Sequence, residues 1–126
     1  MKNVHPFSQS QEDFLEALLM LEEKGETLST TNVANILRVS KPAVHQMGHE
    51  LIDRGLITRI DYGAMSLTKK GREVAERTWK RHRVLKEFLM ELGVSEETAE
   101  KDCCEIEHAL SEETASCIER YLEQKR

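Results

Sequence analysis

The sequence predicts a mostly α-helical protein with a small β-hairpin: an N-terminal winged helix-turn-helix followed by a helical domain. Apolar residues recur at helical spacing through most of the 126 residues, and only one short stretch alternates as strands do. Charged residues make up 33% and aromatic residues 5% of the chain, a balance typical of helical globular proteins. Gly and Pro are scarce, with six and two copies, so few helices are interrupted.

Capping residues predict where six helices begin. Ser and Thr side chains commonly accept hydrogen bonds from backbone N–H groups in the first turn of a helix. In each case helical periodicity starts directly after the cap. The expected caps are Ser10 (paired with Asp13), Ser29 or Thr30, Ser40, Thr68, Ser95 and Ser111.

Two short helices joined by residues 38–40 predict a helix-turn-helix, and strands at 56–60 and 64–67 joined by a turn at 61–63 predict a wing. The second short helix would present small polar and basic groups outward. Such groups suit phosphate and base-edge contacts in the major groove. We therefore expect double-stranded DNA as a partner, contacted by Thr30, Ser40, Lys41, Pro42, Ala43, His45, Gln46, Arg59, Tyr62 and Lys69. A wing used only for protein contacts is the alternative.

Charge changes sign along the chain. The formal net charge is −5, yet residues 29–72 hold seven Lys and Arg against three acids, a balance of +4. Residues 73–126 hold nine basic and fourteen acidic residues, a balance of −5. This asymmetry predicts a DNA-binding domain at 1–72 and a helical domain with another task at 73–126. Uneven surface solvation is the simpler explanation.

The protein is expected in the cytoplasm. No apolar run is long enough to span a bilayer, and the first residues lack the apolar core of a signal peptide. Three cysteines, an odd number, argue against a disulfide framework and fit a reducing compartment.

A group of possible metal ligands stands out near residue 105. On a helix, Cys104, Glu107 and His108 share one face because residues three and four apart are neighbours. Thiolate, carboxylate and imidazole are the common protein ligands of divalent transition metals, so the spacing predicts a metal sensor. The neighbouring face carries an apolar stripe of Ala99, Cys103, Ile106 and Leu110.

Other candidate ligands have ordinary explanations when each is considered alone. Asp13 and Glu16 lie on one side of the first helix, where acids often complement the helix dipole. His82 falls within the apolar stripe Val74, Thr78, Leu85 and Leu89 of the fourth helix, and a histidine there is usually a core residue. The basic residues Arg77, Lys80, Arg81 and Arg83 are expected on the outer side of that helix.

Several short motifs together resemble the diphtheria toxin repressor family, in particular its short branch of manganese-transport regulators. They lie at residues 11–16, 38–44, 55–57, 67–71, 81–83 and 105–111, so the resemblance covers nearly the whole chain. It implies a homodimeric winged-helix transcriptional repressor of metal uptake or homeostasis genes, without the SH3-like C-terminal domain of the longer branch. Residues 73–126 would bind metal and form the dimer, and divalent metal would join the first, fourth and fifth helices. The ligands implied by position are Asp13, Glu16, His82, Cys104, Glu107 and His108.

The implied ligand set mixes two branches of that family. The iron branch has a cysteine where Cys104 stands and the manganese branch a glutamate, whereas Asp13 matches the manganese branch. Lys86 replaces the accessory carboxylate of the iron branch, so an accessory site would have to use Glu16 with His82. Because a thiolate favours softer ions, we expect Fe²⁺ ahead of Mn²⁺, with one or two ions per subunit. Neither Cys103 nor Cys117 receives a metal-binding role.

Two other functions remain open at this point. One is a winged-helix regulator that senses an organic ligand or redox state through its cysteines. The other is a metalloenzyme with Glu107 as a base, which is disfavoured because no His-Glu-x-x-His run and no paired nucleophile occur. His45 and His49 have zinc-ligand spacing, but they lie on the helix expected to contact DNA. The sequence therefore predicts a regulator and not an enzyme.

Overall fold

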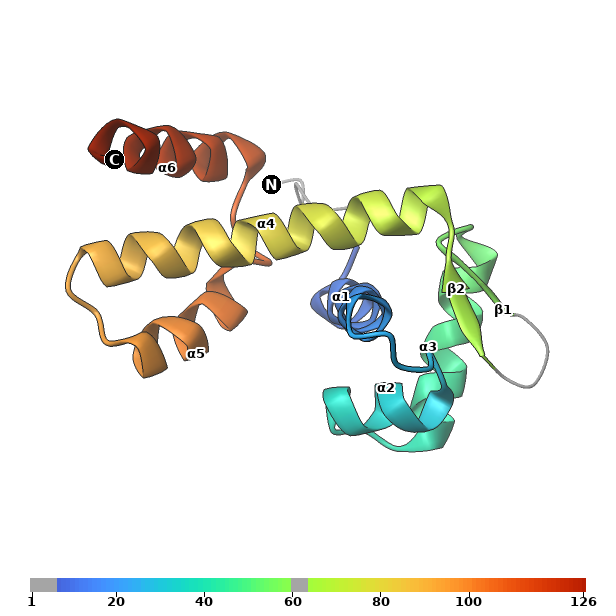
Figure 1. The fold of residues 1–126 in the computed structure, drawn as a ribbon. Coiled ribbons are helices and arrows are strands. Elements are labelled where there is room, and N and C mark those ends of the chain that lie inside the picture. The colour runs from blue at the N-terminus through green and yellow to red at the C-terminus, as the bar shows by residue number, and fades with distance from the viewer. Residues whose placement is uncertain (1–6, 60–63) are drawn as a thin grey trace. The chain divides into compact units, whose positions relative to one another are not determined.

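The structure is a computed structural model that describes residues 7–59 and 64–126 (Figure 1). The described residues form two compact units: residues 9–76, and residues 77–126 together with residues 7 and 8. Helix α4 (Lys69–Glu91) contributes residues to both. The assignment of separate tasks to residues 1–72 and 73–126 stays a prediction. In the described residues, no helix has the length and apolar character that crossing a membrane requires.

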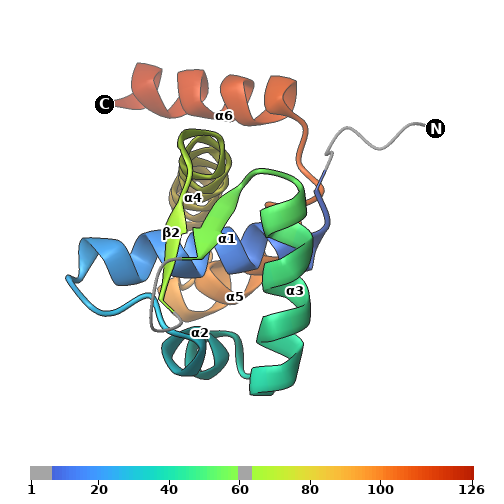
Figure 2. The same cartoon turned by 90° about the vertical axis from the view of Figure 1, so that its right-hand side faces the viewer.

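The first unit contains three helices and a two-stranded hairpin, as the sequence predicted. Its core is formed by fully buried side chains that recur at helical spacing in α1 and continue through the next two helices. Strand β1 follows α3 and packs beside it (Figure 2). The elements are α1 (Gln9–Glu23), α2 (Thr30–Leu37), α3 (Lys41–Asp53), β1 (Ile57–Arg59) and β2 (Met65–Leu67).

Five of the six predicted helix starts are confirmed by hydrogen bonds to the capping oxygen. Only the cap at Ser10 is wrong, because α1 begins at Gln9 and places Ser10 inside an exposed first turn. Backbone N–H groups in such a turn can be satisfied by water. The confirmed bonds are Asn32 N to Ser29 Oγ (3.1 Å), Ala43 N to Ser40 Oγ (3.2 Å), Gly71 N to Thr68 Oγ1 (3.0 Å), Thr98 N to Ser95 Oγ (3.3 Å) and Thr114 N to Ser111 Oγ (3.1 Å).

The turn between α2 and α3 confirms the helix-turn-helix. Arg38 ends α2 in the left-handed conformation (φ 56°, ψ 46°), and the N–H of Val39 bonds to the carbonyl of Ala34 at 3.2 Å. Left-handed backbone costs a non-glycine residue about 1–2 kcal/mol, so the surrounding helices must hold this turn in place. Ser40 begins α3 two residues later, with Pro42 in the first turn.

The hairpin is shorter than the sequence predicted. Antiparallel pairing joins Ile57 to Leu67 and Arg59 to Met65, and residues 56 and 64 lie outside the strands. The N–H of Met65 bonds to the carbonyl of Leu28 at 2.9 Å, which ties the hairpin to the segment before α2. The predicted turn at 61–63, including Tyr62, lies outside the described residues.

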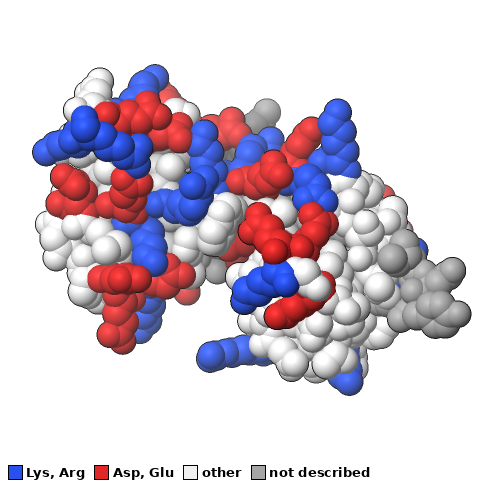
Figure 3. All heavy atoms as spheres, viewed as in Figure 1, with Lys and Arg blue, Asp and Glu red and all other residues white. Residues whose placement is uncertain are grey.

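In the second unit, α5 (Glu96–Ile106) and α6 (Glu112–Lys125) lie on opposite sides of α4 (Figures 1 and 2). Phe88 of α4 meets Tyr121 of α6 edge to face, with ring centroids 5.9 Å apart. Lys80 pairs with Glu119 at 3.2 Å, between the same two helices. Figure 3 shows acidic and basic side chains interspersed over this unit, in keeping with such surface pairs.

Three expectations for the second unit are corrected. Helix α5 ends at Ile106, so Glu107 caps it and His108 lies in the following turn, where the N–H of Ala109 bonds back to Ile106 at 2.9 Å. Ile106 has 42% of its surface exposed, so it does not belong to the core stripe. Arg81 is buried at 7% exposure and does not lie on the outer side of α4.

Gly71 at the start of α4 provides a test of this packing. A Cβ atom there would lie 1.9 Å from the carbonyl oxygen of Leu56, and backbone cannot yield as a flexible side chain does. We expect Gly71→Ala to lower the free energy of unfolding of the first unit by about 2–3 kcal/mol. Urea unfolding followed by circular dichroism measures this loss.

Gly48→Ala is the matched control, because Gly48 also lies inside a helix but its added Cβ would meet its nearest neighbours at 3.9 Å. Alanine favours helices over glycine by up to about 1 kcal/mol, so this variant should be as stable as the parent or more stable. Equal stability of the two variants would contradict the packing described for Gly71.

Candidate metal centre

His82 lies at the centre of the candidate site. It is 5% exposed and stacks on Trp79, three residues earlier on α4, with ring centroids 5.6 Å apart and planes 5° from parallel. Its Nδ1 lies 2.7 Å from Oε2 of Glu107, and its Nε2 lies 3.1 Å from Oε2 of Glu100. Both ring nitrogens are thus held by carboxylates of the second unit, which is called the helical unit from here on.

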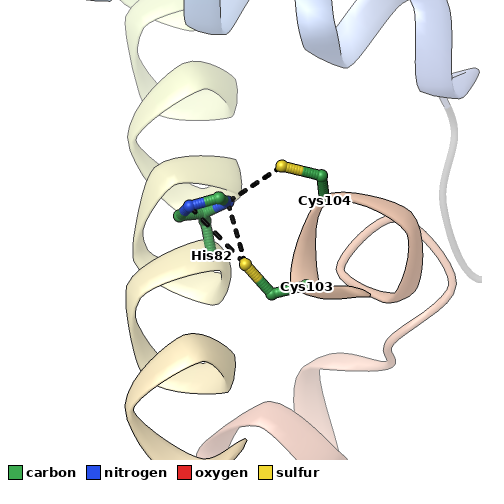
Figure 4. Close-up of side chains that lie close together, drawn as sticks. All are labelled: His82, Cys103 and Cys104. Carbon is green, nitrogen blue, oxygen red and sulfur yellow. Dashed lines mark hydrogen bonds between the residues drawn. The ribbon is translucent and has the colours of Figure 1, made fainter. Parts of the chain in front are cut away.

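One face of α5 brings four polar side chains toward His82. Glu100, Cys103, Cys104 and Glu107 are spaced at intervals of three and four residues, so they line one side of the helix. Sγ of Cys103 lies 3.5 Å from Nδ1 and 3.6 Å from Nε2 of His82, and Sγ of Cys104 lies 4.0 Å from Nδ1 (Figure 4). One possible ligand atom from each of His82, Cys103 and Cys104 falls within 4.8 Å of the others.

Glu107 and His108 are also withdrawn from solvent. Glu107 is 2% and His108 9% exposed, and Nε2 of His108 lies 3.3 Å from Oε1 of Glu107. The carboxylate of Glu107 therefore stands between two imidazoles. Burial of so many polar groups is costly unless they satisfy one another or hold an ion.

Electrostatics favour a protonated His82 when no metal is bound. The hydrogen bond to Glu107 raises the pKa of His82 to about 9 against the opposing effect of burial, and the charges of Glu107 and Glu100 add to the rise. As an imidazolium, His82 donates from both nitrogens to the two carboxylates. Burial raises the pKa of the Cys103 thiol to about 12, and the nearby Cys104, Glu100 and Glu107 act in the same direction.

Lys86 lies one turn after His82 and binds the outer carboxylate. Its Nζ lies 3.1 Å from Oε2 of Glu100 and 3.7 Å from Oε1 of Glu96. Burial works to raise the pKa of Glu100, but the hydrogen bond from Lys86 and the charge of His82 outweigh it and lower that pKa. Lys86 therefore holds Glu100 in its ionised form against the His82 ring.

These donors fit a divalent transition metal. Imidazole nitrogen, thiolate sulfur and carboxylate oxygen are its usual ligands, and the burial of His82, Cys103 and Glu107 would strengthen their interaction with a cation. An imidazolium shared by two carboxylates places one positive charge where a divalent cation would place two. A cation at Nδ1 of His82 has to replace the proton there.

The structure brings together four predicted ligands, His82, Cys104, Glu107 and His108, in the helical unit. Asp13 and Glu16 lie half-buried on α1 of the first unit, and their role as ligands stays a prediction. Sequence reasoning assigned Cys103 to the core and gave Glu100 no role, yet both contact His82. The signal that could have found them is helical spacing, because Cys103 lies four residues and Glu100 seven residues before Glu107.

The residues expected to contact DNA are largely accessible. Thr30 and Ala43 are half-buried, and Tyr62 lies outside the described residues. Contact with DNA stays a prediction for all ten residues named in the sequence analysis. The exposed members are Ser40, Lys41, Pro42, His45, Gln46, Arg59 and Lys69.

Two family descriptions match consecutive parts of the chain. Residues 6–65 match the N-terminal DNA-binding domain of iron-dependent repressors. Residues 68–126 match the metal-binding and dimerisation domain of the same repressors. Together the matches cover nearly the whole sequence.

Named relatives and solved structures agree with this assignment. A helix-turn-helix transcriptional regulator of Methanocaldococcus jannaschii is 36% identical over 118 residues, which cover 92% of this chain and 94% of the relative. The transcriptional regulator MntR of Escherichia coli is 34% identical over 113 residues, which cover 89% of this chain and 72% of the relative.

The solved structure of the manganese regulator SloR matches with a TM-score of 0.80 and 28% identity over 90% of this chain. The matched part covers 53% of SloR, so the chain spans about half the length of that regulator. The chain belongs to the iron-dependent repressor family, which includes the diphtheria toxin repressor and the manganese transport regulators, as its motifs predicted.

Proposed function

We propose that this protein is a transcriptional repressor that binds double-stranded operator DNA as a homodimer when a divalent metal ion occupies the site around His82. The observation that supports this most directly is the convergence of an imidazole, two thiols and a buried carboxylate in one cluster. The winged helix-turn-helix of the other unit supplies the DNA-binding half of the proposal. Its targets would be genes of metal uptake or homeostasis.

The proposed ligands are those the family resemblance implied. His82, Cys104, Glu107 and His108 come from the helical unit. Asp13 and Glu16, both on α1, are proposed to complete the coordination from the DNA-binding unit. Ligands drawn from both units would let an ion fix the arrangement of the DNA-binding helices that an operator requires.

Fe²⁺ is proposed as the physiological ion, with Mn²⁺ as the alternative. A thiol among the donors supports Fe²⁺, because sulfur ligands favour softer ions than Mn²⁺. The names of solved structures support Mn²⁺ for those proteins, since SloR is named as a manganese regulator and another match as a manganese-dependent transcriptional repressor. One or two ions per subunit are compatible with the number of donors.

Protons and metal would compete for the same atoms. A bound cation supplies the positive charge and the coordination that hold the donors together. The Nδ1–H group of His82 donates a hydrogen bond to Glu107, and this proton must leave before Nδ1 can bind a metal ion. The thiol of Cys104 must likewise ionise before it can act as a ligand. Metal can then favour DNA binding only through its higher affinity for the DNA-competent arrangement, a coupling typically worth about 1–3 kcal/mol.

The other functions are less well supported. Regulation by a non-metal ligand is not favoured, because the family and its named members respond to metals. The family and relatives are transcriptional regulators, and we propose no catalytic role. As a repressor the protein would act in the cytoplasm, where its operator is found.

The central test is DNA binding with and without metal. Operator duplexes would be selected from a random library with the Fe²⁺-loaded protein under anaerobic conditions. We expect affinity for a selected duplex to rise by roughly 5–150-fold on adding Fe²⁺ or Mn²⁺, as the coupling free energy implies. Electrophoretic mobility shift measures this, and equal affinity with and without metal rules out the proposed sensing.

His108→Ala tests the ligand set. We expect it to weaken metal binding by at least about tenfold because it removes one neutral nitrogen donor, and to abolish the metal response of DNA binding. Fluorescence of Trp79, the single tryptophan, reports binding because its ring stacks on His82. His49→Ala is the matched control, since His49 is exposed on α3 and should leave metal binding unchanged. Circular dichroism checks that both variants fold.

Stability of the metal-free protein should depend on pH. The pKa of His82 is raised from 6.5 to about 9, so its contribution is complete below pH 6.5 and is lost as the pH rises through 9. The raised pKa of Cys103 extends the loss above pH 9. We expect the free energy of unfolding to fall by roughly 1–3 kcal/mol between pH 6.5 and 9, measured by urea unfolding in chelator. His82→Gln should flatten this dependence, and a parent protein whose stability rises over that interval would refute it.

A further inference from the structure

We propose that Cys103 is a second thiolate ligand, so that the helical unit holds a site for thiophilic divalent cations such as Zn²⁺, Cd²⁺ and Co²⁺. The site comprises Nδ1 of His82 and the Sγ atoms of Cys103 and Cys104. It shares His82 and Cys104 with the metal site proposed above and adds a donor that the family resemblance did not imply. This inference deepens the proposed function and rests on it for its biological role.

The distances suit tetrahedral coordination. Zinc bonds of about 2.0–2.1 Å to nitrogen and 2.3 Å to sulfur at tetrahedral angles place nitrogen about 3.6 Å from each sulfur and the two sulfurs about 3.8 Å apart. Nδ1 of His82 lies 3.5 Å from Sγ of Cys103 and 4.0 Å from Sγ of Cys104. All three donors fall within 4.8 Å of one another, so side-chain adjustments of less than about 1 Å would complete the geometry.

The His82 ring is already oriented for such a site. Its Nε2 is bound by the carboxylate of Glu100, which Lys86 holds in turn at 3.1 Å. A carboxylate on the far nitrogen of a metal-binding histidine fixes the ring and increases the basicity of the ligating nitrogen. Nδ1 is then the nitrogen left for an ion, and Oε2 of Glu107, which lies 2.7 Å from Nδ1, is available as a fourth donor beside the two sulfurs.

The surroundings of Cys103 differ from those of an ordinary core cysteine. A free cysteine in a core behaves as a small apolar group and packs against hydrocarbon. Cys103 is fully buried, yet its sulfur lies within 3.6 Å of both nitrogens of an imidazole and 3.3 Å from the carbonyl of Glu100. Two adjacent cysteines on α5 both approach the same ring, as Figure 4 shows.

Two thiols beside carboxylates would let the protein distinguish classes of metal. Hard ions such as Mn²⁺ prefer oxygen donors, which Glu107 supplies, whereas soft ions prefer the sulfur pair. Each thiol and Nδ1 of His82 would release a proton to solvent on binding, and no oxidant is needed. A thiophilic ion would therefore occupy the sulfur side of His82 without requiring any ligand from the DNA-binding unit.

Anaerobic titration of the full chain with Co²⁺ tests the proposal. Thiolate bonds to Co²⁺ give a near-ultraviolet charge-transfer band whose intensity increases with the number of sulfur ligands. We expect Cys103→Ser and Cys104→Ser each to lose about half of that intensity at saturation, and the double variant to lose all of it. Cys117→Ser is the matched control, because Cys117 is exposed on α6 and should leave the band unchanged.

Cys103→Ala keeps the proposal testable if the serine variant folds poorly, because alanine leaves no polar group in the buried position. X-ray absorption of the Cd²⁺-loaded protein should count two sulfur neighbours in the parent and one in this variant. Full band intensity in both folded Cys103 variants, one sulfur neighbour in the parent, or no Co²⁺ binding would each overturn the second thiolate.

Failure of this proposal is distinguishable from failure of the proposed function. A single sulfur ligand together with metal-dependent operator binding would remove only Cys103 from the site. Two sulfur ligands with operator binding that ignores metal would support the thiolate pair and overturn the sensing role.

Discussion

The pairing of His82 with Glu107 across 2.7 Å is the interaction on which the helical unit depends. Both side chains are almost fully buried, and burial of an unpaired charge there would be costly. The pair links the middle of α4 to the end of α5. The net charge of the pair depends on whether a proton or a metal ion occupies Nδ1. A metal ion can therefore replace the proton in the same contact that supports the fold.

The surrounding charges explain why this pair is tolerated and why it can accept a cation. Glu100 and Glu107 place two carboxylates against one imidazolium, and Lys86 binds the outer carboxylate. These positive and negative charges balance only while His82 keeps its second proton. A divalent cation that replaces this proton would supply the positive charge that deprotonation removes, which gives the cluster a physical reason to bind metal.

Much of the fold could be predicted from the sequence because its signals are local. Caps such as Ser40 and Ser95 fix helix starts through bonds within three residues, and the helix-turn-helix follows from two such helices with a short connection. Helix ends were harder to predict, because the turn after Ile106 is closed by a bond between backbone groups that carries no residue signature. The predicted exposure of Arg81 was wrong for a similar reason, because periodicity cannot show that the rest of the fold buries a charged side chain.

The sequence predicted the types of side chain in the candidate site, but it did not predict that Glu100 and Cys103 also contact His82. His82, considered alone, appeared to be an ordinary core residue, and its contact with Glu107 became visible only in the fold. Cys103 was assigned to the core because it shares a stripe with Ala99, and that assignment is correct for its burial. The stripe could not reveal that the side chain next to the Cys103 sulfur is the imidazole of His82 rather than a hydrocarbon group.

The order of donors along α5 provides a simple route to metal preference. Glu100, Cys103, Cys104 and Glu107 place two sulfurs between two carboxylates along one helical face, with His82 opposite. Because each turn of the helix advances about 5.4 Å, neighbouring donors on this face can reach one ion together while the outermost two cannot share it equally. A soft ion would settle at the central sulfur pair and a hard ion toward a carboxylate, so the position of the ion along the helix would follow its chemistry. Metal selectivity would then arise from the register of one helix against one imidazole.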